Sequence, residues 1–429
     1  RIVDPACGTG HFLLGAARRL AVAVARARGE PGAVQAAFVE VIRRCIYGVD
    51  LNPMAVELCR VALWLEAAVP GLPLDVSGAH LQLGNALLGA SAAQIAAGIP
   101  ENAWEAAEGE DRSIARMLRA RHRAEAGAAW TGTADLRLLA DLWCAAFVWP
   151  KQSEEALLSA PLPALWSAAC SSPSSLPSPT RHILAELRAR YHFFHWFLAF
   201  PEVFGRGGFD VVLGNPPYLN QLESHTTVDR GVSRLLDARF GPLKQAYTDL
   251  ATLFMVEAQH ILRPGGRQVL VHPLAMFAAK DAGPARRRLA GHGAISGLWI
   301  TTEHIFDSAL VFVGAVCLVK GGSRRSTVLR HHGNDFIPAE SLPLDMDRLA
   351  AEPTWGALIA DLIGVPRVEL PNPTRLGSLA STTADFRDEF YGLAPFVVED
   401  TVKTRNDRRF PPLIVTGLID PAESLWGQR

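Results

Sequence analysis

The sequence of 429 residues lacks the patterns that mark membrane and secreted proteins. No apolar run approaches the roughly 20 uninterrupted residues of a membrane helix. The N-terminus does not show the basic, apolar and small-residue order of a signal peptide. Its six cysteines are scattered and form no C-x-x-C pair, which argues against a zinc site or a disulfide framework. We therefore expect a cytoplasmic protein with reduced thiols, no bound metal and no membrane partner.

An overall basic charge is also missing. The chain has 42 basic and 43 acidic residues and a formal net charge of -1 at pH 7. It therefore has no global positive field of the kind that many nucleic-acid-binding proteins carry. Any contact with a nucleic acid must be local. Basic clusters that could make such a contact, although each is more often a solvated face, occur at 286–288, 324–325 and 403–409.

Strands and helices alternate along much of the chain. A short strand at 2–3 leads into the turn DPACGTG and a helix at 11–26, and a second strand, CIYGVD, precedes a helix from about 53 to 68. The segment HLQLGNALLG supplies a third strand. After residue 208, strands in FDVVLG, RQVLVHP, AISGLWITT and ALVFVGAVCLV flank helices at 248–262, which RPGG closes, and 284–290. This spacing predicts a doubly wound, mostly parallel α/β sheet, with the last two strands pairing as neighbours.

Four regions follow from this pattern. Residues 1–90 and 209–332 form the two parts of the α/β domain, separated by a helical insertion at 91–208 that contains one flexible Ser/Pro-rich loop, SSPSSLPSP. From 333 to 429 periodicity is weak, and Pro, Asp and Gly are frequent. We expect a linker and the start of a different domain there.

Polar residues and glycines lie at the ends of the first three predicted strands. Gly8 and Gly10 stand where the backbone must turn sharply close to a ligand. Asp50, at the end of the second strand, can accept hydrogen bonds from both hydroxyls of a ribose, and Asp4 could meet a cationic cofactor tail. Asn85 could bind an adenine edge. The alternatives are that the aspartates cap helices and that Asn85 is a turn residue. Together they predict an adenosyl ligand across the sheet.

The fourth strand ends in Asn-Pro-Pro-Tyr at 215–218. Proline lacks an N–H and restrains the preceding residue to extended conformations. The Asn215 side-chain oxygen and the Pro216 carbonyl can therefore accept hydrogens at one point. A planar aromatic amine that donates both hydrogens there is driven toward a pyramidal, nucleophilic nitrogen, while Tyr218 stacks on a base that has left the duplex. The alternative is an ordinary Asn-Pro turn with an exposed tyrosine.

The segments DPACGTGHFLL, GVDLNPMAVELCRVALWL, HLQLGNALLG, FHWFLAFPEVF, FDVVLGNPPY and DLATLFMVEAQHILRPGGRQVLVHP resemble the gamma-class adenine-N6 DNA methyltransferases of the type IIG restriction-modification and phage-defence (BREX-like) group. The resemblance covers roughly 1–320. It implies a class I (Rossmann-like) fold with a C-terminal antiparallel strand pair, S-adenosylmethionine as cofactor with no metal for methyl transfer, double-stranded DNA with a target adenine as partner, and nuclease or other defence-system subunits as further partners.

The same resemblance implies roles for individual residues. The expected catalytic residues, with the aromatic that sandwiches the flipped base named last, are Asn215, Pro216, Pro217, Tyr218 and Phe306. The expected cofactor-binding residues are Asp4, Ala6, Gly8, Gly10, Asp50, Leu51, Asn85 and Ala86.

The chain departs from this group at both ends. It begins after the position of a further cofactor-binding segment and ends before a complete target-recognition region, so we expect an incomplete piece. Two alternatives stay open. One is methylation of a protein glutamine amide or an RNA guanine amine, which poses the same chemical problem. The other is a truncated, inactive module that binds DNA or a partner. The long gap between Gly10 and Asn215 favours DNA.

Overall fold

The computed structural model describes residues 1–67, 80–106, 109–125, 135–218, 230–303, 305 and 311–365, together with 374, 378, 409, 419–420 and 423–424. The chain forms two compact units, Arg1–Arg367 and Val368–Arg429. In the second unit, strands β10 (Ile419–Asp420) and β11 (Glu423–Ser424) pair antiparallel. All elements described below belong to the first unit.

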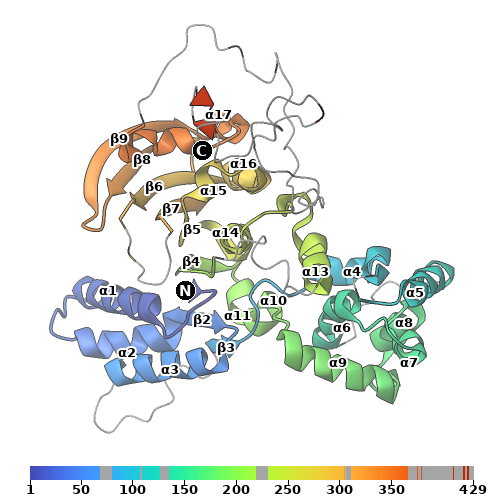
Figure 1. Cartoon of the computed structure of the whole chain (residues 1–429). Helices are drawn as coiled ribbons and strands as arrows, with labels where there is room; N and C mark the ends of the chain where they lie inside the picture. Colours follow the sequence, from blue (N-terminus) through green and yellow to red (C-terminus); the bar gives the residue numbers. More distant parts are fainter. Residues whose placement is uncertain are drawn as a thin grey trace. The chain divides into compact units, whose positions relative to one another are not determined.

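A mixed sheet forms the centre of the first unit (Figure 1). Among the described residues its order is β3-β2-β1-β4-β5-β7-β6-β8-β9. The strands are β1 (Ile2–Asp4), β2 (Ile46–Asp50), β3 (Leu81–Leu83), β4 (Phe209–Gly214), β5 (Leu262–Pro273), β6 (Gly293–Thr301), β7 (Val313–Lys320), β8 (Arg325–His332) and β9 (Ile337–Asp345). The strands from β3 to β5 are parallel, β7 runs antiparallel to both of its neighbours, and β9 is antiparallel to β8. The predicted doubly wound sheet and the pairing of β6 with β7 are confirmed.

Helices α1 (His11–Ala27), α2 (Val34–Cys45) and α3 (Pro53–Ala67) pack together beside β2 and β3 (Figure 1). Helix α1 buries a residue every four positions, from Leu13 to Ala25, so one stripe faces the core. Helix α2 was not predicted from the sequence. Its buried residues lie in two adjacent pairs one turn apart, 37–38 and 41–42, which is a helical spacing.

A second layer covers β4 to β7 with α14 (Leu250–Ile261), α15 (Ala275–Ala278) and α16 (Gly283–His292). Helix α14 is buried on almost every side and joins β5 directly. The segment RPGG, expected to close that helix, therefore lies within the irregular start of β5. No described helix has both the length and the hydropathy needed to cross a membrane.

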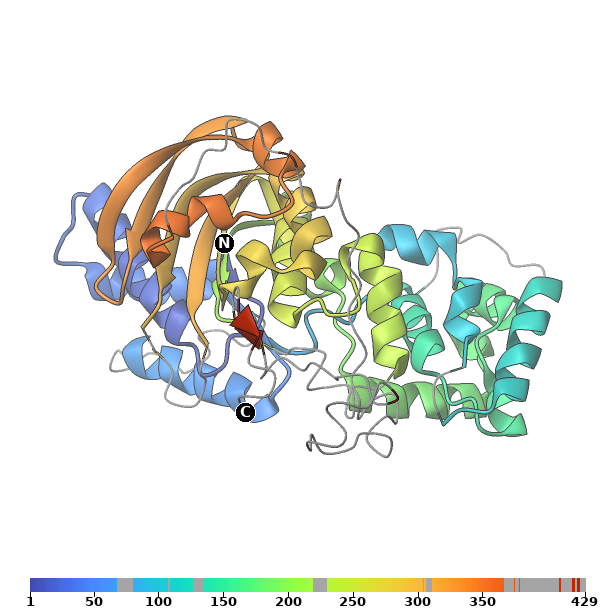
Figure 2. The ribbon, with the colours of Figure 1, turned by 45° about the horizontal axis from the view of Figure 1, so that its top comes forward.

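The insertion forms a helical lobe beside the sheet (Figure 2). Helix α6 (Leu136–Val148) is its centre, because its residues 139–148 are all buried. Around it lie α4 (Ala92–Ala97), η1 (Glu101–Trp104), α5 (Arg112–Ala124), α7 (Glu154–Ser159), α8 (Pro163–Ser171), η2 (Pro173–Ser175), α9 (Ser178–Tyr191) and α13 (Arg230–Phe240). The short helices α10 (Trp196–Ala199) and α11 (Pro201–Phe204) lead back to the sheet, where Phe200 packs against Phe209 of β4. The Ser/Pro-rich segment contains a 3-10 turn and leads into α9, whose first turn holds Pro179, and the flexibility expected of it stays a prediction.

The sheet continues past Gly333, where we expected another domain to begin. Strand β9 pairs with β8, and α17 (Met346–Ala351) follows it within the first unit. In β8 exposed positions alternate with buried or half-buried ones, and every residue of β9 is exposed or half-buried. Strands covered on one face only carry few apolar residues, so the hydrophobic pattern is weak there.

Candidate active site at the carboxyl edge of the sheet

The carboxyl ends of β3, β2, β1 and β4 lie side by side. Parallel pairing sets Asp4 opposite Gly48 and Asp50 opposite Leu83, while Val3 pairs with Val212. The glycine turn and the Asn-Pro-Pro-Tyr segment therefore leave adjacent strands, β1 and β4. The strand order reverses at β1, and open α/β sheets bind ligands at such a reversal. The structure thus brings together the two segments that the predicted chemistry requires.

Asp4 and Gly214 fix the spacing between these segments. Gly214 has φ of 152°, and a Cβ built on it would lie 2.4 Å from Asp4 Oδ1. Only glycine fits at this position. Asp4 is 1% exposed, and its Oδ1 accepts a hydrogen bond from the Ala6 N–H at 3.0 Å. Burial raises the pKa of Asp4 to about 7, with the charge of Asp50 adding to this and the Ala6 N–H opposing it.

The two glycines of the turn have different roles. Both have positive φ, 51° at Gly8 and 88° at Gly10. A Cβ on Gly10 would lie 2.6 Å from Cys59 Sγ, so this glycine lets α1 pack against α3. A Cβ on Gly8 would meet nothing within 4 Å. The backbone at Gly8 therefore borders open space at the reversal point, as a ligand-binding turn requires.

Asp50 connects the glycine turn after β1 with the turn after β2. Its Oδ2 accepts the Gly8 N–H and its Oδ1 accepts the Asn52 N–H, each at 2.8 Å. The side chain of Asn52 accepts the Met54 N–H at 2.9 Å and thereby caps α3. Helix α1 has Gly10 at its N-cap and no side-chain cap. The helix-cap alternative is therefore wrong for Asp50 and for Asp4. Leu51 lies beside this turn and is 49% exposed.

Asn85 is built into the loop after β3. Its Oδ1 accepts the Leu87 N–H at 3.1 Å, and its own N–H donates to the His192 carbonyl at 2.8 Å. The turn role considered as an alternative is thus present, and a contact with a cofactor stays a prediction that would use the amide nitrogen. Ala86 is buried, and its carbonyl accepts the Trp196 indole N–H at 3.0 Å.

A buried pair supports the same loop and was not predicted. His195 Nδ1 accepts the Ala90 N–H at 3.0 Å, so the ring proton lies on Nε2, which donates to Asp141 Oδ1 at 3.0 Å. Arg188 pairs with the other oxygen of Asp141 at 2.6 Å. Asp141 comes from α6, more than fifty residues away along the chain, so no local motif could have connected it with His195.

The Asn-Pro-Pro-Tyr segment is closed on itself. Pro216 is buried and Pro217 exposed, while Asn215 and Tyr218 are half-buried. The Tyr218 hydroxyl donates a hydrogen bond to Asn215 Oδ1. Burial, with a contribution from the Asp249 carboxylate, raises the pKa of Tyr218, so the hydroxyl keeps its proton. The Asn215 acceptor is present, but the tyrosine covers it. Phe306 lies outside the described residues.

The basic clusters proposed from the sequence are mostly structural. Arg286 is 1% exposed and donates to the carbonyls of Met276, Ala279 and Pro353. Arg324 pairs with Asp347 at 2.7 Å. Most of 403–409 lies outside the described residues. Arg286 in particular cannot reach a nucleic acid, because its guanidinium is enclosed by backbone oxygens.

Comparison with known families shows which family the chain belongs to. The family described as Eco57I restriction-modification methylase matches residues 44–306, which include Asp50, Asn85 and the Asn-Pro-Pro-Tyr segment. The chain belongs to this family. The adenine-specific methyltransferase PglX of Streptomyces coelicolor (strain ATCC BAA-471 / A3(2) / M145) is 38% identical to it over 97 residues, covering 20% of this chain and 8% of PglX.

Solved structures similar to this Eco57I-family chain include three restriction-modification proteins. A modification subunit of a putative type I restriction enzyme from Vibrio vulnificus YJ016 has 12% identity and a TM-score of 0.37, covering 77% of this chain and 42% of its own. The DNA complex of MmeI has 14% identity and a TM-score of 0.39, covering 80% and 34%. The DNA-bound nuclease-deletion mutant of LlaGI has 11% identity and a TM-score of 0.40, covering 82% and 22%. The chain thus spans less than half the length of each.

Proposed function

We propose that this chain is the catalytic part of a site-specific DNA methyltransferase that modifies adenine N6 with S-adenosylmethionine as methyl donor. The observation that carries the proposal is the contact of Gly214 with Asp4, which sets the Asn-Pro-Pro-Tyr segment directly beside the glycine turn. Membership of a restriction-modification methylase family supports methyl transfer to DNA. Double-stranded DNA with a target adenine is then the substrate, and a nuclease or other defence-system subunits are the partners.

The residues at the sheet edge fit this cofactor. The open space beside Gly8 can take the adenosyl part of the cofactor. The Asp50 carboxylate accepts hydrogen bonds from two backbone N–H groups and retains lone pairs for the ribose hydroxyls. The buried carboxyl of Asp4 suits a cationic tail. When bound, S-adenosylmethionine supplies a methyl group already activated by a sulfonium, so no strong base is needed before transfer.

The chain's own contribution is to orient and activate the amine. The Asn215 side-chain oxygen and the Pro216 carbonyl accept the two hydrogens of adenine N6, which favours a pyramidal nitrogen with an available lone pair. The Tyr218 hydroxyl must first leave Asn215 Oδ1, and the freed ring can then stack on the flipped base. Holding the reactants in line can supply about 7 to 11 kcal/mol in favourable systems.

A labelled methyl donor tests the proposal. Duplex DNA, RNA and protein are offered to the full chain, and the labelled product is identified. Label in N6-methyladenine of duplex DNA is the expected result. Label in a glutamine amide or a guanine amine would instead select the alternative substrates, and the absence of donor binding by calorimetry would select the inactive module.

Asn215→Ala tests the assigned role of the acceptor. We expect methyl transfer to be lost while donor affinity stays within a few fold of wild type, because Asn215 holds the amine and not the donor. Asn102→Ala removes an exposed asparagine in the insertion and serves as the control. Wild-type activity of Asn215→Ala would contradict the mechanism.

A further inference from the structure

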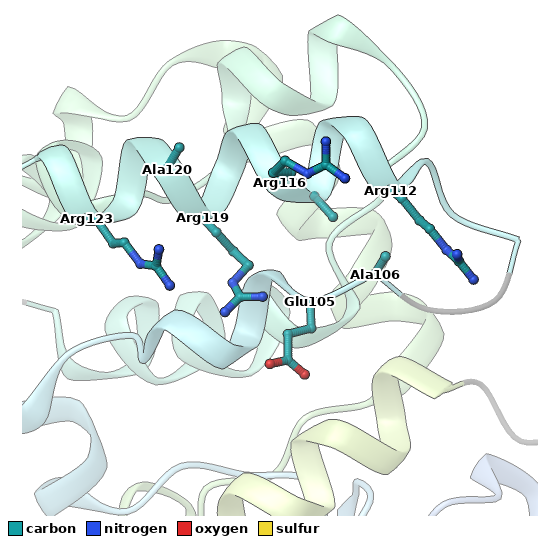
Figure 3. Close-up of a pocket in the computed structure, with 8 residues that line it drawn as sticks. Glu105, Ala106, Arg112, Arg116, Arg119, Ala120 and Arg123 are labelled. Carbon is teal, nitrogen blue, oxygen red and sulfur yellow. The ribbon is translucent and has the colours of Figure 1, made fainter.

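Arginine side chains line a cavity in the helical insertion, away from the sheet edge. Arg112, Arg116, Arg119 and Arg123 surround a volume of about 470 Å³ between α5 and the segment that ends at Ala106 (Figure 3). Their spacing of four, three and four residues places all four on one face of α5. The cavity is therefore a basic groove that follows the helix, here called the α5 groove.

The frame of the α5 groove is fixed. The opposite face of α5 is buried through Ile114 and Leu118. Asp111 caps the helix by accepting the Ser113 N–H at 2.7 Å and the Ile114 N–H at 3.4 Å. The arginine face is thus held in place by packing and capping, so a ligand need not order the helix.

The charges in the α5 groove do not cancel. Glu101 accepts hydrogen bonds from Arg119 at 3.0 Å and from Arg123 at 2.8 Å, and these arginines lower the pKa of Glu101 to about 2. Glu105 contributes a second carboxylate (Figure 3). The four guanidinium groups of the groove outnumber these two carboxylates. Within the described part of the chain, neither Arg112 nor Arg116 has an ion-pair partner, so both can bind an anion.

The basic side chains that line the α5 groove are all arginine. The guanidinium stays charged at every relevant pH and presents a planar fork of donors that matches phosphate oxygens. Positions four residues apart rise by about 6 Å along a helix. One face of α5 can therefore meet several phosphates of one strand. Since the chain as a whole has a net charge of -1, this local surface is distinct from its surroundings.

We propose that the α5 groove binds the phosphodiester backbone of DNA without reading its sequence. It would be a second contact for the nucleic acid, separate from the site of methyl transfer. The choice of DNA over another polyanion rests on the proposed function. The groove itself rests on the arginine face and its unpaired charges.

Equilibrium binding of DNA without methyl donor tests the α5 groove. The full chain is titrated against a fluorescent duplex of mixed sequence, several helical turns long, at a series of salt concentrations. For Arg112→Gln/Arg116→Gln we expect weaker binding at low salt and a decrease of about 2 in the steepness of the plot of log affinity against log salt, because about two phosphate contacts are lost. Glu105→Gln should bind more tightly.

A matched control removes the same charge elsewhere. Arg19→Gln/Arg26→Gln replaces two exposed arginines of α1, seven residues apart on one face, and should keep the wild-type affinity and salt dependence. Unchanged binding of the groove variant, or an equal loss in the α1 variant, would overturn the proposal. Binding of labelled polyglutamate to the α5 groove without binding of duplex DNA would also overturn the proposal, and would favour an acidic protein as the ligand.

The outcome is separable from that of the proposed function. Asn215→Ala should bind the duplex with the wild-type salt dependence, since Asn215 lies outside the α5 groove. If no substrate is methylated but the groove variant still binds duplex more weakly than wild type, the methyltransferase proposal fails and the groove stands. If methylation of DNA proceeds and the groove variant binds like wild type, only the groove fails.

Discussion

Asp4 should couple donor binding to the release of a proton. The carboxyl is 1% exposed, and burial raises its pKa to about 7 from an ordinary value of 3.8. Asp50 faces it and adds to this effect. Cys7 is another titratable group nearby, and its hydrogen bond with the Cys59 thiol together with burial raises its own pKa, so it stays neutral. Below pH 7, Asp4 is therefore mostly a neutral acid that must ionise to pair with a cation.

The magnitude follows from the two pKa values. Their difference of about 3 pH units corresponds to at most about 4 kcal/mol, at about 1.4 kcal/mol per pH unit. Because the folded-state pKa is raised, the stability from protonated Asp4 is fully present below pH 3.8 and is lost as the pH rises to about 7. A cationic donor recovers part of that loss, so donor affinity should fall by up to about tenfold for each pH unit below 7.

Calorimetry checks both predictions. S-adenosylmethionine is titrated into the chain from about pH 5.5 to 7.5, where most of its own amine is protonated, in buffers of different ionisation enthalpy. Close to one proton should be released per donor bound near pH 6, and the number should fall steadily as the pH rises to 7.5. Asp4→Asn keeps an acceptor for the Ala6 N–H. It should abolish the proton release, bind the donor weakly at every pH and melt at a higher temperature than wild type above pH 7.

Two results would refute this reasoning. One is donor binding by the wild type with no proton release near pH 6. The other is an Asp4→Asn variant with the same proton release as the wild type. Either would show that the buried carboxyl does not sense the charge of the donor, and Asp4 would then be only a packing residue behind Gly214.

Two further changes probe the catalytic segment. Gly214→Ala places a Cβ 2.4 Å from the side chain of Asp4 at a φ of 152°, which should destabilise the fold by about 2 to 6 kcal/mol and separate the segment from the first turn. The control Gly15→Ala, where a Cβ meets nothing within 4 Å, should be neutral or stabilising by up to about 1 kcal/mol, so equal melting temperatures for the two variants would exclude the clash. Tyr218→Phe keeps the ring but removes the hydroxyl that covers Asn215 Oδ1, so kcat/KM for DNA should rise by up to about tenfold, the equivalent of one hydrogen bond. A fall of that size would mean that the hydroxyl takes part in transfer.

The sequence predicted the elements that have a strong period or a distinct end. The sequence predicts that β2 ends at Asp50 and that α3 begins at Pro53, because the segment CIYGVD ends in an aspartate and a first-turn proline follows it. Helix α2 and strand β9 were missed. Helix α2 buries only two pairs of residues and has four charged or amide side chains in twelve residues. Strand β9 lies at the sheet edge, and all its positions are exposed or half-buried.

Only those features of the site that depend on local sequence motifs could be predicted. The spacing of motifs placed Gly8, Asp50 and Asn215 at one edge, because parallel strand ends share an edge. The bond between Tyr218 and Asn215 depends on side-chain rotamers, which a motif does not fix. The α5 groove lies in the insertion, which the sequence predicts only to be helical, because its cavity depends on how the chain before Ala106 folds against the arginine face.

Gly214 shows how a structural requirement extends a catalytic motif. In the proposed mechanism the oxygens that activate the amine come from Asn215 and Pro216, yet neither residue sets the distance of these oxygens from the donor. Gly214 does so, because the absence of its Cβ lets the carboxyl of Asp4 lie against the backbone of β4. Any larger residue would push β1 and β4 apart at their carboxyl ends, where donor and amine must meet. We therefore propose that the functional unit is Gly-Asn-Pro-Pro-Tyr together with Asp4, the first residue of the neighbouring turn.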